Sequence, residues 1–150
     1  MRVIIQRVSK ASVSIQDKVC GEIQCGFLIL LGITDGDTQE DIDWLVGKIT
    51  KMRIFPDHEG KMNLSLHDVS GELLIVSQFT LHSNTKKGNR PSFIRSARPD
   101  VAIPLYEQFL KTAEQELGKP CGSGKFGADM QISLINDGPV TISMDSKARE

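Results

Sequence analysis

Alternation of apolar and polar positions predicts a strand-rich first third of the chain. In ASVSIQ, Val13 and Ile15 alternate with serine and glutamine, and a period of two is typical of a strand with one buried face. GFLILLGI, by contrast, is apolar throughout, which predicts a strand covered on both faces. The strands expected here are residues 2–9, 11–16, 19–23 and 26–33, with a turn at Asp17-Lys18.

A period near 3.6 residues predicts two helices, over residues 38–53 and 99–117. The first has Thr38 as an N-cap and Asp41 three residues later, and acidic residues suit the positive end of a helix dipole. Pro104 is expected in the first turn of the second helix. The apolar stripes that would face a core are Ile42, Leu45, Val46, Ile49 and Met52 in the first helix, and Ala102, Leu105, Phe109, Ala113 and Leu117 in the second.

Three further strands are expected, over residues 72–81, 130–136 and 140–144. ELLIVSQFTL becomes polar towards its end, so its last residues should emerge at an edge of the sheet. The two later strands meet at Asn136-Asp137-Gly138-Pro139, where an Asp-Gly hairpin accounts for the join adequately. Many strands with two helices predict a single mixed α/β, α+β-like domain over residues 1–150.

Composition narrows the class of protein. The chain has 150 residues, 39% hydrophobic and 25% charged, and its net charge of −1 provides no global field for nucleic acid or a membrane surface. Any polyanionic partner must therefore be held by a local patch. Val3-Ile4-Ile5 is too short an apolar run for a signal peptide or a membrane span. Three cysteines without a CxxC pair indicate a reducing, cytoplasmic compartment and buried or idle thiols.

Two motifs resemble ligand sites but lack the flanking elements or the residues that such sites require. Residues 122–127, GSGKFG, match GxGxxG, but they follow a helix and lead into a strand, the reverse of what dinucleotide binding requires. Residues 35–39 resemble the start of a calcium loop, but Glu40 and Val46 stand where that loop needs glycine and glutamate. No histidine pair has the spacing of metal ligands, so neither a metal site nor a cofactor is expected.

A serine hydrolase would need a nucleophile, a histidine base and an orienting acid. Ser77 lacks the glycines of a nucleophile elbow. His67-Asp68 and His82 would have to approach it in space, and nothing in their spacing indicates that they do. Surface or loop histidines are the simpler interpretation.

Three segments keep a functional interpretation beside a structural one. Residues 77–81, SQFTL, end an expected buried strand, where sheets carry sites, although a strand that emerges into a loop is the plainer explanation. The loop over 82–99 carries five cations, no acid and the interleaved Phe93; it suits phosphates or is simply a solvated loop. Gly138-Pro139 is the third, because a turn peptide can also be placed for chemistry.

Together, these segments resemble the D-aminoacyl-tRNA deacylase family. The motifs that carry the resemblance are IIQRVSKASVSI, RIFPDHEGKMNLSL, SQFTL, RPSF and FGADMQISLINDGPVT, which span essentially the whole chain. SQFTL and NDGPVT, about sixty residues apart and in this order, are specific as a pair, whereas neither is specific alone. The resemblance implies a barrel-like fold and a cytoplasmic homodimer with active sites at the subunit interface, without membrane contact.

The resemblance also implies a reaction and its selectivity. The enzyme would hydrolyse the ester between a D-amino acid and the terminal adenosine of tRNA, which is chiral proofreading in translation. Gly138 and Pro139, joined by a cis peptide, would reach into the partner subunit's active site and fill the space that an L side chain needs. Arg7 would brace this segment by donating to carbonyls. Glycine has no side chain to exclude, so glycyl-tRNA is expected to be a substrate as well.

The SQFTL motif would supply the chemistry. Ser77 and Gln78 are expected to shape the pocket and to hydrogen-bond the substrate. The backbone N–H groups around Phe79 and Thr80 are candidates for the oxyanion hole. No base is evident that would activate Thr80 as a nucleophile, so the resemblance favours positioning of a water with help from the substrate's own 2′-OH.

The remaining motifs would hold the RNA. Phe126 and Met130 are candidates for packing on the terminal adenine, with ordinary core as their alternative. Lys86, Lys87 and Arg90 are candidates for contact with the acceptor stem of aminoacyl-tRNA, with little sequence preference. Three other interpretations stay open: a relative with a trans Gly-Pro peptide that tolerates a small L-amino acid, a non-catalytic RNA-binding module, and a Ser-His-Asp esterase, which insensitivity to serine-directed reagents would exclude.

Overall fold

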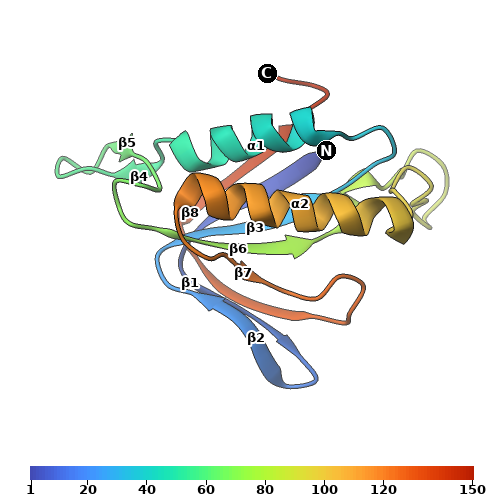
Figure 1. Ribbon diagram of the computed structural model, residues 1–150, viewed down its shortest axis with the longest axis horizontal. Coiled ribbons are helices and arrows are strands. Elements are labelled where there is room, and N and C mark those ends of the chain that lie inside the picture. The colour runs from blue at the N-terminus through green and yellow to red at the C-terminus, as the bar shows by residue number, and fades with distance from the viewer.

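Two helices lie side by side across one face of a six-stranded sheet in the computed structural model, which describes residues 1–150 (Figure 1). They are α1 (Gln39–Lys51) and α2 (Pro99–Leu117), and a short 3-10 helix, η1 (Phe79–His82), follows the fourth strand of the sheet along the chain. The strands of the sheet are β1 (Arg2–Ile15), β2 (Lys18–Ile23), β3 (Gly26–Gly32), β6 (Glu72–Ser77), β7 (Gly122–Ser123) and β8 (Gln131–Asp145). A separate small hairpin consists of β4 (Phe55–Pro56) and β5 (Met62–Leu64).

The sheet is mixed and nearly closes on itself. Its strand order is β2-β1-β3-β6-β7, with β8 on the free side of β1. The β3–β6 and β6–β7 pairs are parallel and the others antiparallel. The two outer strands of this order approach each other, since a Cβ added at Gly21 of β2 would lie 2.8 Å from the carbonyl oxygen of Ser123 in β7. The expected mixed α/β class with a barrel-like sheet is confirmed.

β1 is one strand where the sequence predicted two. Arg2–Val8 pairs with β3, whereas Ala11–Ile15 pairs with β2. The predicted break near residue 10 is therefore a change of partner along a continuous strand. The turn into β2 lies at Gln16 and Asp17, both with positive φ, one residue earlier than predicted.

The predicted hairpin at residues 136–139 is wrong. Both halves of β8 pair with the same strand, with Asn136 opposite Val8 and Thr141 opposite Gln6. The four residues between them, Asp137–Val140, face the single residue Arg7 and form an extended bulge. Turn-forming residues here make the bulge instead of reversing the chain, because β1 is long enough to pair with both apolar halves.

The two predicted helices are confirmed, with small differences at their ends. Thr38 caps α1, and the Asp41 carboxylate accepts from its N–H at 2.8 Å. Pro104 lies beyond the first turn of α2, inside the helix, so one intrahelical hydrogen bond is missing there. The predicted stripes face the core, except that Tyr106 is buried where Leu105 was expected.

Apolar side chains are buried on both faces of the sheet. The larger cluster fills the space between the sheet and the two helices, and includes Phe27, Ile49 and Phe109. The smaller one lies on the opposite face and contains Val13, Leu28 and five other residues. Burial on both sides explains the unbroken apolar run in β3. Neither helix has the length and apolarity that crossing a lipid bilayer requires.

Candidate active site

The polar end of β6 leaves the sheet abruptly. The predicted strand over 72–81 is wrong beyond Ser77, because β3 ends at Gly32 and offers no further partner for the ladder. The last ladder bond runs from the Gln78 N–H to the Leu31 carbonyl at 2.7 Å. The chain then enters η1, whose first N–H groups have no partner within the helix.

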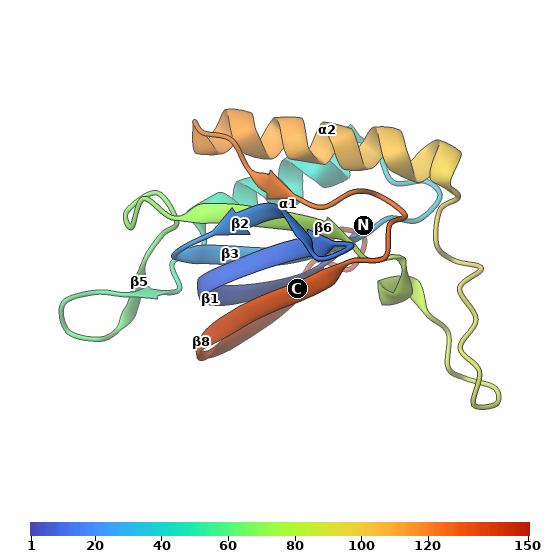
Figure 2. The same ribbon diagram turned by 90° about the horizontal axis from the view of Figure 1, so that it is seen from below.

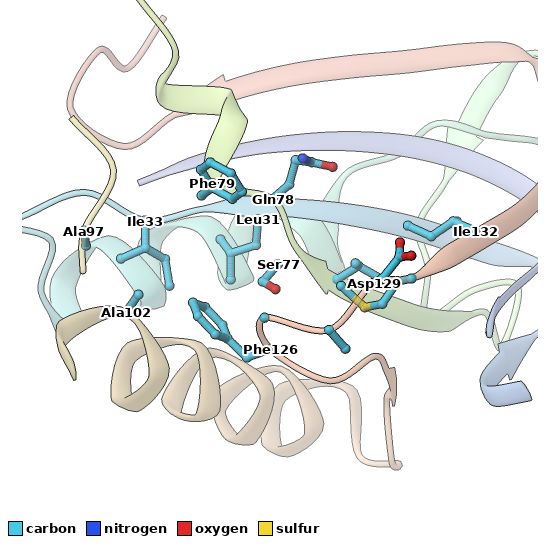
Figure 3. Close-up of a pocket in the computed structure, with 14 residues that line it drawn as sticks. Leu31, Ile33, Ser77, Gln78, Phe79, Ala97, Ala102, Phe126, Asp129 and Ile132 are labelled. Atoms are coloured by element: carbon cyan, nitrogen blue, oxygen red, sulfur yellow. The ribbon is translucent and has the colours of Figure 1, made fainter. Parts of the chain in front are cut away.

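A cavity of about 270 Å³ opens at this strand end, and we call it the SQFTL cavity (Figure 3). Ser77, Gln78 and Phe79 line it from the strand end and η1, and Phe126 and Met130 line it from the loop before β8. Five of the residues proposed from the sequence are thus brought together from segments about fifty residues apart. Most of the remaining lining is apolar, and it comes from β3, β6, the start of α2 and the loop before it, and the segment around the start of β8.

Asp129 is the only ionisable side chain that lines the SQFTL cavity, and the sequence reasoning missed its role there (Figure 3). It lies between Phe126 and Met130 in the FGADM motif, so the motif itself was the available signal. No ion pair holds its carboxylate. The cavity therefore combines apolar walls with a few polar groups, a combination typical of small-ligand sites.

Thr80 lies beside the cavity without lining it. Its hydroxyl accepts a hydrogen bond from the Gln78 side-chain amide at 2.6 Å, and an amide is not a base. No hydrogen bond joins Ser77 or Thr80 to a histidine. The serine, histidine and aspartate considered for a triad are not assembled, since the Asp68 carboxylate accepts from Ser65 instead.

His82 is buried, although the sequence favoured a surface or loop position. His82 is the last residue of η1. It is 5% exposed, and its Nε2 has no hydrogen-bond partner. Burial lowers the pKa of this imidazole, with Arg2 and the N-terminal ammonium acting in the same direction. The Gly32 carbonyl and Asp37 oppose that shift. A neutral imidazole is thus buried at the end of η1.

The cation-bearing loop over residues 82–99 is attached to η1 near the C-terminal end of the loop. The Ser96 hydroxyl donates to the Phe79 carbonyl at 2.7 Å, and the Phe93 ring meets the Phe79 ring edge-on with centroids 5.2 Å apart. An isolated bridge between Asn84 and Ser92 closes the loop upon itself. Lys86, Lys87 and Arg90 are exposed on the part of the loop beyond that bridge, and none of them lines the SQFTL cavity. Figure 2 shows this loop extending away from the body of the protein.

The bulge of β8, Asp137–Val140, is the Gly-Pro segment. Gly138 and Pro139 are exposed, and the peptide bond between them is cis. Arg7 is buried behind them, where its Nε donates to the Asp137 carbonyl at 3.1 Å and its Nη1 donates to the Ile54 carbonyl.

Gly138 has little room for a side chain. It has φ of +129°, and a Cβ added there would lie 2.9 Å from the Arg7 guanidinium. Neither Gly138 nor Pro139 lines the SQFTL cavity of its own chain.

No group of three or more His, Cys, Asp and Glu side chains is placed to hold a metal ion. The three cysteines are unpaired, and Cys20 and Cys25 are exposed rather than buried. Burial raises the pKa of the Cys121 thiol to about 12.

Comparison with known proteins gives consistent matches over the full length. The D-Tyr-tRNA(Tyr) deacylase family matches residues 4–145. A D-aminoacyl-tRNA deacylase of Flavobacterium johnsoniae is 63% identical over 150 residues, all of both chains, and one of Akkermansia muciniphila is 61% identical over the same length.

Solved structures also match over nearly the whole chain. The match with the c-Myc DNA Unwinding Element Binding Protein covers 99% of this chain and 100% of that protein's chain. The identity is 39% and the TM-score is 0.91. A probable eukaryotic D-amino acid tRNA deacylase covers 95% of this chain and 97% of its own with a TM-score of 0.81. Its identity of 22% makes that a likeness of fold alone.

Proposed function

The chain belongs to the D-Tyr-tRNA(Tyr) deacylase family, and on that premise we propose that it hydrolyses the ester of D-aminoacyl-tRNA to a free D-amino acid and tRNA. The observation that carries the proposal is the SQFTL cavity. It gathers Ser77, Gln78 and Phe79 on one side and Phe126 and Met130 on the other, as a site for an aminoacylated adenosine requires. The reaction takes place in the cytoplasm, where aminoacyl-tRNA is used.

Hydrolysis proceeds by attack of a positioned water on the ester carbonyl. The N–H groups of Phe79 and Thr80, at the start of η1, donate to the oxyanion that forms. The Thr80 hydroxyl is held by the Gln78 amide and has no base beside it. The substrate's 2′-OH, next to the ester, orients the water, so the protein contributes mainly position and electrostatic stabilisation.

Selectivity against L-amino acids requires a second subunit. Gly138 and Pro139 are exposed and lie outside the cavity of their own chain, so a partner's Gly-Pro segment completes each site in a homodimer. Phe79, at the cavity, and Ile135, next to the bulge of β8, are 54% and 50% exposed, so apolar surface is available for a subunit interface at both places. Backbone carbonyls of the Gly-Pro segment then occupy the space of an L side chain.

The RNA is held on both sides of the ester. Phe126 and Met130 pack on the terminal adenine. Lys86, Lys87 and Arg90, on the exposed part of the loop, contact phosphates of the acceptor stem. Attachment of this loop to Phe79 through Ser96 couples RNA contact to the position of η1.

The decisive experiment compares deacylation of D-tyrosyl-tRNA and L-tyrosyl-tRNA by the purified protein and by Gly138→Ala. We expect only the D-ester to be cleaved, and the variant to be impaired, because a Cβ at this position meets Arg7 at 2.9 Å. Cleavage of both esters by the native protein would contradict the proposed steric gate. Cleavage of neither, with tRNA still bound, would favour the non-catalytic RNA-binding module.

Glycyl-tRNA provides a second test of the gate. A filter that works only by excluding a side chain has nothing to exclude in glycine, so the native protein should deacylate glycyl-tRNA at a rate within about tenfold of D-tyrosyl-tRNA, less than about 1.4 kcal/mol in barrier height. The measurement is release of labelled glycine. Intact glycyl-tRNA beside cleaved D-tyrosyl-tRNA would contradict a purely steric filter.

Thr80→Ala separates positioning from covalent catalysis. We expect the variant to keep measurable activity, with a loss of about 10- to 100-fold at most, since only a hydrogen bond to Gln78 disappears. The control is Thr112→Ala, a half-buried residue of α2 outside the cavity, whose hydroxyl makes only long contacts of 3.4 Å. Complete loss of activity together with a trapped acyl-enzyme on the native protein would establish Thr80 as a nucleophile.

A further inference from the structure

A second cavity adjoins the SQFTL cavity. Its volume is about 900 Å³, and it shares Phe126, Gly127, Ala128 and Asp129 with the first as a common wall. Its other walls come from the turn between β1 and β2, from Lys125, and from the first residue of β8. A ligand that fills the SQFTL cavity and is longer than one nucleoside can pass over this wall into the second cavity.

The two cavities differ in chemistry. The SQFTL cavity is lined mostly by hydrophobic residues, whereas only three of the nine residues around the second are hydrophobic. Its polar side chains make no hydrogen bond or ion pair within the chain, and they are Gln16, Asp17, Lys125, Asp129 and Gln131. Two amides, two carboxylates and one ammonium group therefore face one hollow with their hydrogen-bonding capacity unused.

We propose, resting on the function proposed above, that the second cavity receives the nucleotide that precedes the terminal adenosine of the substrate. In tRNA this is a cytidine of the single-stranded CCA end. Carboxylate oxygens accept hydrogen bonds from the exocyclic amine of cytosine, and Asp17, Asp129 and the glutamine amides are the groups available to read that edge.

Charge fixes the orientation of this nucleotide. Lys125 is the only cation around the second cavity, so the phosphate that links the two nucleotides lies on its side. The carboxylates of Asp17 and Asp129 face the same cavity and would repel the phosphate, which favours a position beside Lys125. Lys125 adjoins Phe126 in sequence, so the phosphate contact lies beside the aromatic ring proposed to pack on the adenine.

The proposal is tested by comparing a long and a short substrate. The long one is D-tyrosyl-tRNA, and the short one is 3′-O-(D-tyrosyl)adenosine, which fills only the SQFTL cavity. Lys125→Met should lower kcat/KM for the long substrate about five- to tenfold and make its dependence on log salt concentration shallower by about 0.7, as expected for one lost contact to a single strand. It should leave the short substrate unchanged. The matched control is Lys111→Met, an exposed lysine of α2 outside both cavities.

Other results would contradict either this proposal or the proposed function. An equal loss on both substrates would assign Lys125 to the SQFTL cavity, and no loss on either would leave the second cavity without a role; both overturn the proposal. If the native protein cleaves neither D-ester, the proposed function fails, which is a separate result.

The base is tested with chemically aminoacylated RNA microhelices that end in CA or UA. The native protein should prefer the CA end about threefold or more, because uracil lacks the exocyclic amine. Gln131→Ala together with Asp17→Asn, at two residues that line only the second cavity, should weaken that preference while the short substrate is still cleaved. An undiminished preference in the double variant would exclude these side chains as readers of the base.

Discussion

The SQFTL cavity and the Gly-Pro segment are built in opposite ways. The cavity is concave, formed by side chains from β3, β6 and the loop before β8. The Gly-Pro segment is an exposed stretch of backbone on β8, held from behind by the buried Arg7. The cavity offers a space for a ligand, whereas the Gly-Pro segment offers an exposed backbone surface. Because they lie apart within one chain, the selectivity proposed above depends on a second copy that brings them together.

This difference has a mechanical reason. A cavity tolerates small movements of its side chains, whereas a steric filter must not yield when a wrong substrate presses on it. The structure reflects this in the support that each receives. The buried Arg7 guanidinium donates to the Ile54 carbonyl and also to the Asp137 carbonyl of the Gly-Pro segment, which ties that segment to the body of the protein. A single hydroxyl, that of Ser96, links the backbone of Phe79 to the neighbouring loop.

Arg7→Ala should have the largest effect, because it leaves the carbonyls of Asp137 and Ile54 without donors and opens space behind the Gly-Pro segment. We expect the free energy of unfolding to fall by about 2–4 kcal/mol, as measured by urea denaturation. Arg98→Ala is the control, since that side chain is 86% exposed, and it should change stability by less than about 0.5 kcal/mol.

Arg7→Lys addresses selectivity in a protein that stays folded. A lysine keeps the charge but cannot donate to both carbonyls in the fork geometry of arginine, so the loss of stability should be about 1–2 kcal/mol. The ratio of D- to L-tyrosyl-tRNA cleavage should drop at least tenfold, about 1.4 kcal/mol of discrimination. An unchanged ratio would mean that the Gly-Pro segment does not depend on this arginine.

Ser96→Ala should affect the cavity and leave the filter intact. It removes the hydrogen bond to the Phe79 carbonyl, which costs about 0.5–1.5 kcal/mol, or about two- to tenfold in kcat if that backbone must be held for the reaction. The ratio of D- to L-ester cleavage should stay the same. Ser92→Ala, in the same loop, is the matched control, because its hydroxyl makes no hydrogen bond. A fall in selectivity would contradict the separation of the two regions.

His82 gives the smallest and most specific effect. Burial lowers the pKa of its imidazole in the folded protein, so the unfolded chain takes up a proton first as the pH falls below about 6.5. The stabilising contribution of the neutral ring is present above that pH and is lost progressively below it, with a slope of at most about 1.4 kcal/mol per pH unit.

Urea denaturation between pH 7.5 and pH 5, a range chosen around the ordinary pKa of about 6.5, measures this slope. His82→Gln should reduce it, whereas His58→Gln, at an exposed position, should not. Equal slopes in all three proteins would show that the buried imidazole titrates normally. Activity would be expected to follow stability in this range, because His82 ends the helix that carries Phe79 and Thr80.

The local pattern of apolar residues predicted helices and strands well where burial of a fixed face, or pairing with a single strand, determines them. The unbroken apolar run of β3 and the stripes of the two helices were readable, since burial on fixed faces imposes those periods. Strand ends were less readable. β6 stops at Ser77 because β3 has ended, and nothing within ELLIVSQFTL carries that information. The candidate site shows the same limit, since Asp129 stood in a recognised motif but its position in the cavity depends on the loop around it.

The sequence by itself determined the family, the helices, the buried strands and the motifs proposed to carry the chemistry, because these depend on residue types at short, regular spacings. Only the tertiary structure decided that NDGPV is a bulge facing Arg7 and not a hairpin turn. It also decided that Ser77 and Phe126 share one cavity while Gly138 lies outside it. These outcomes depend on which distant segment pairs or packs with which, and no local pattern specifies the partner of a strand.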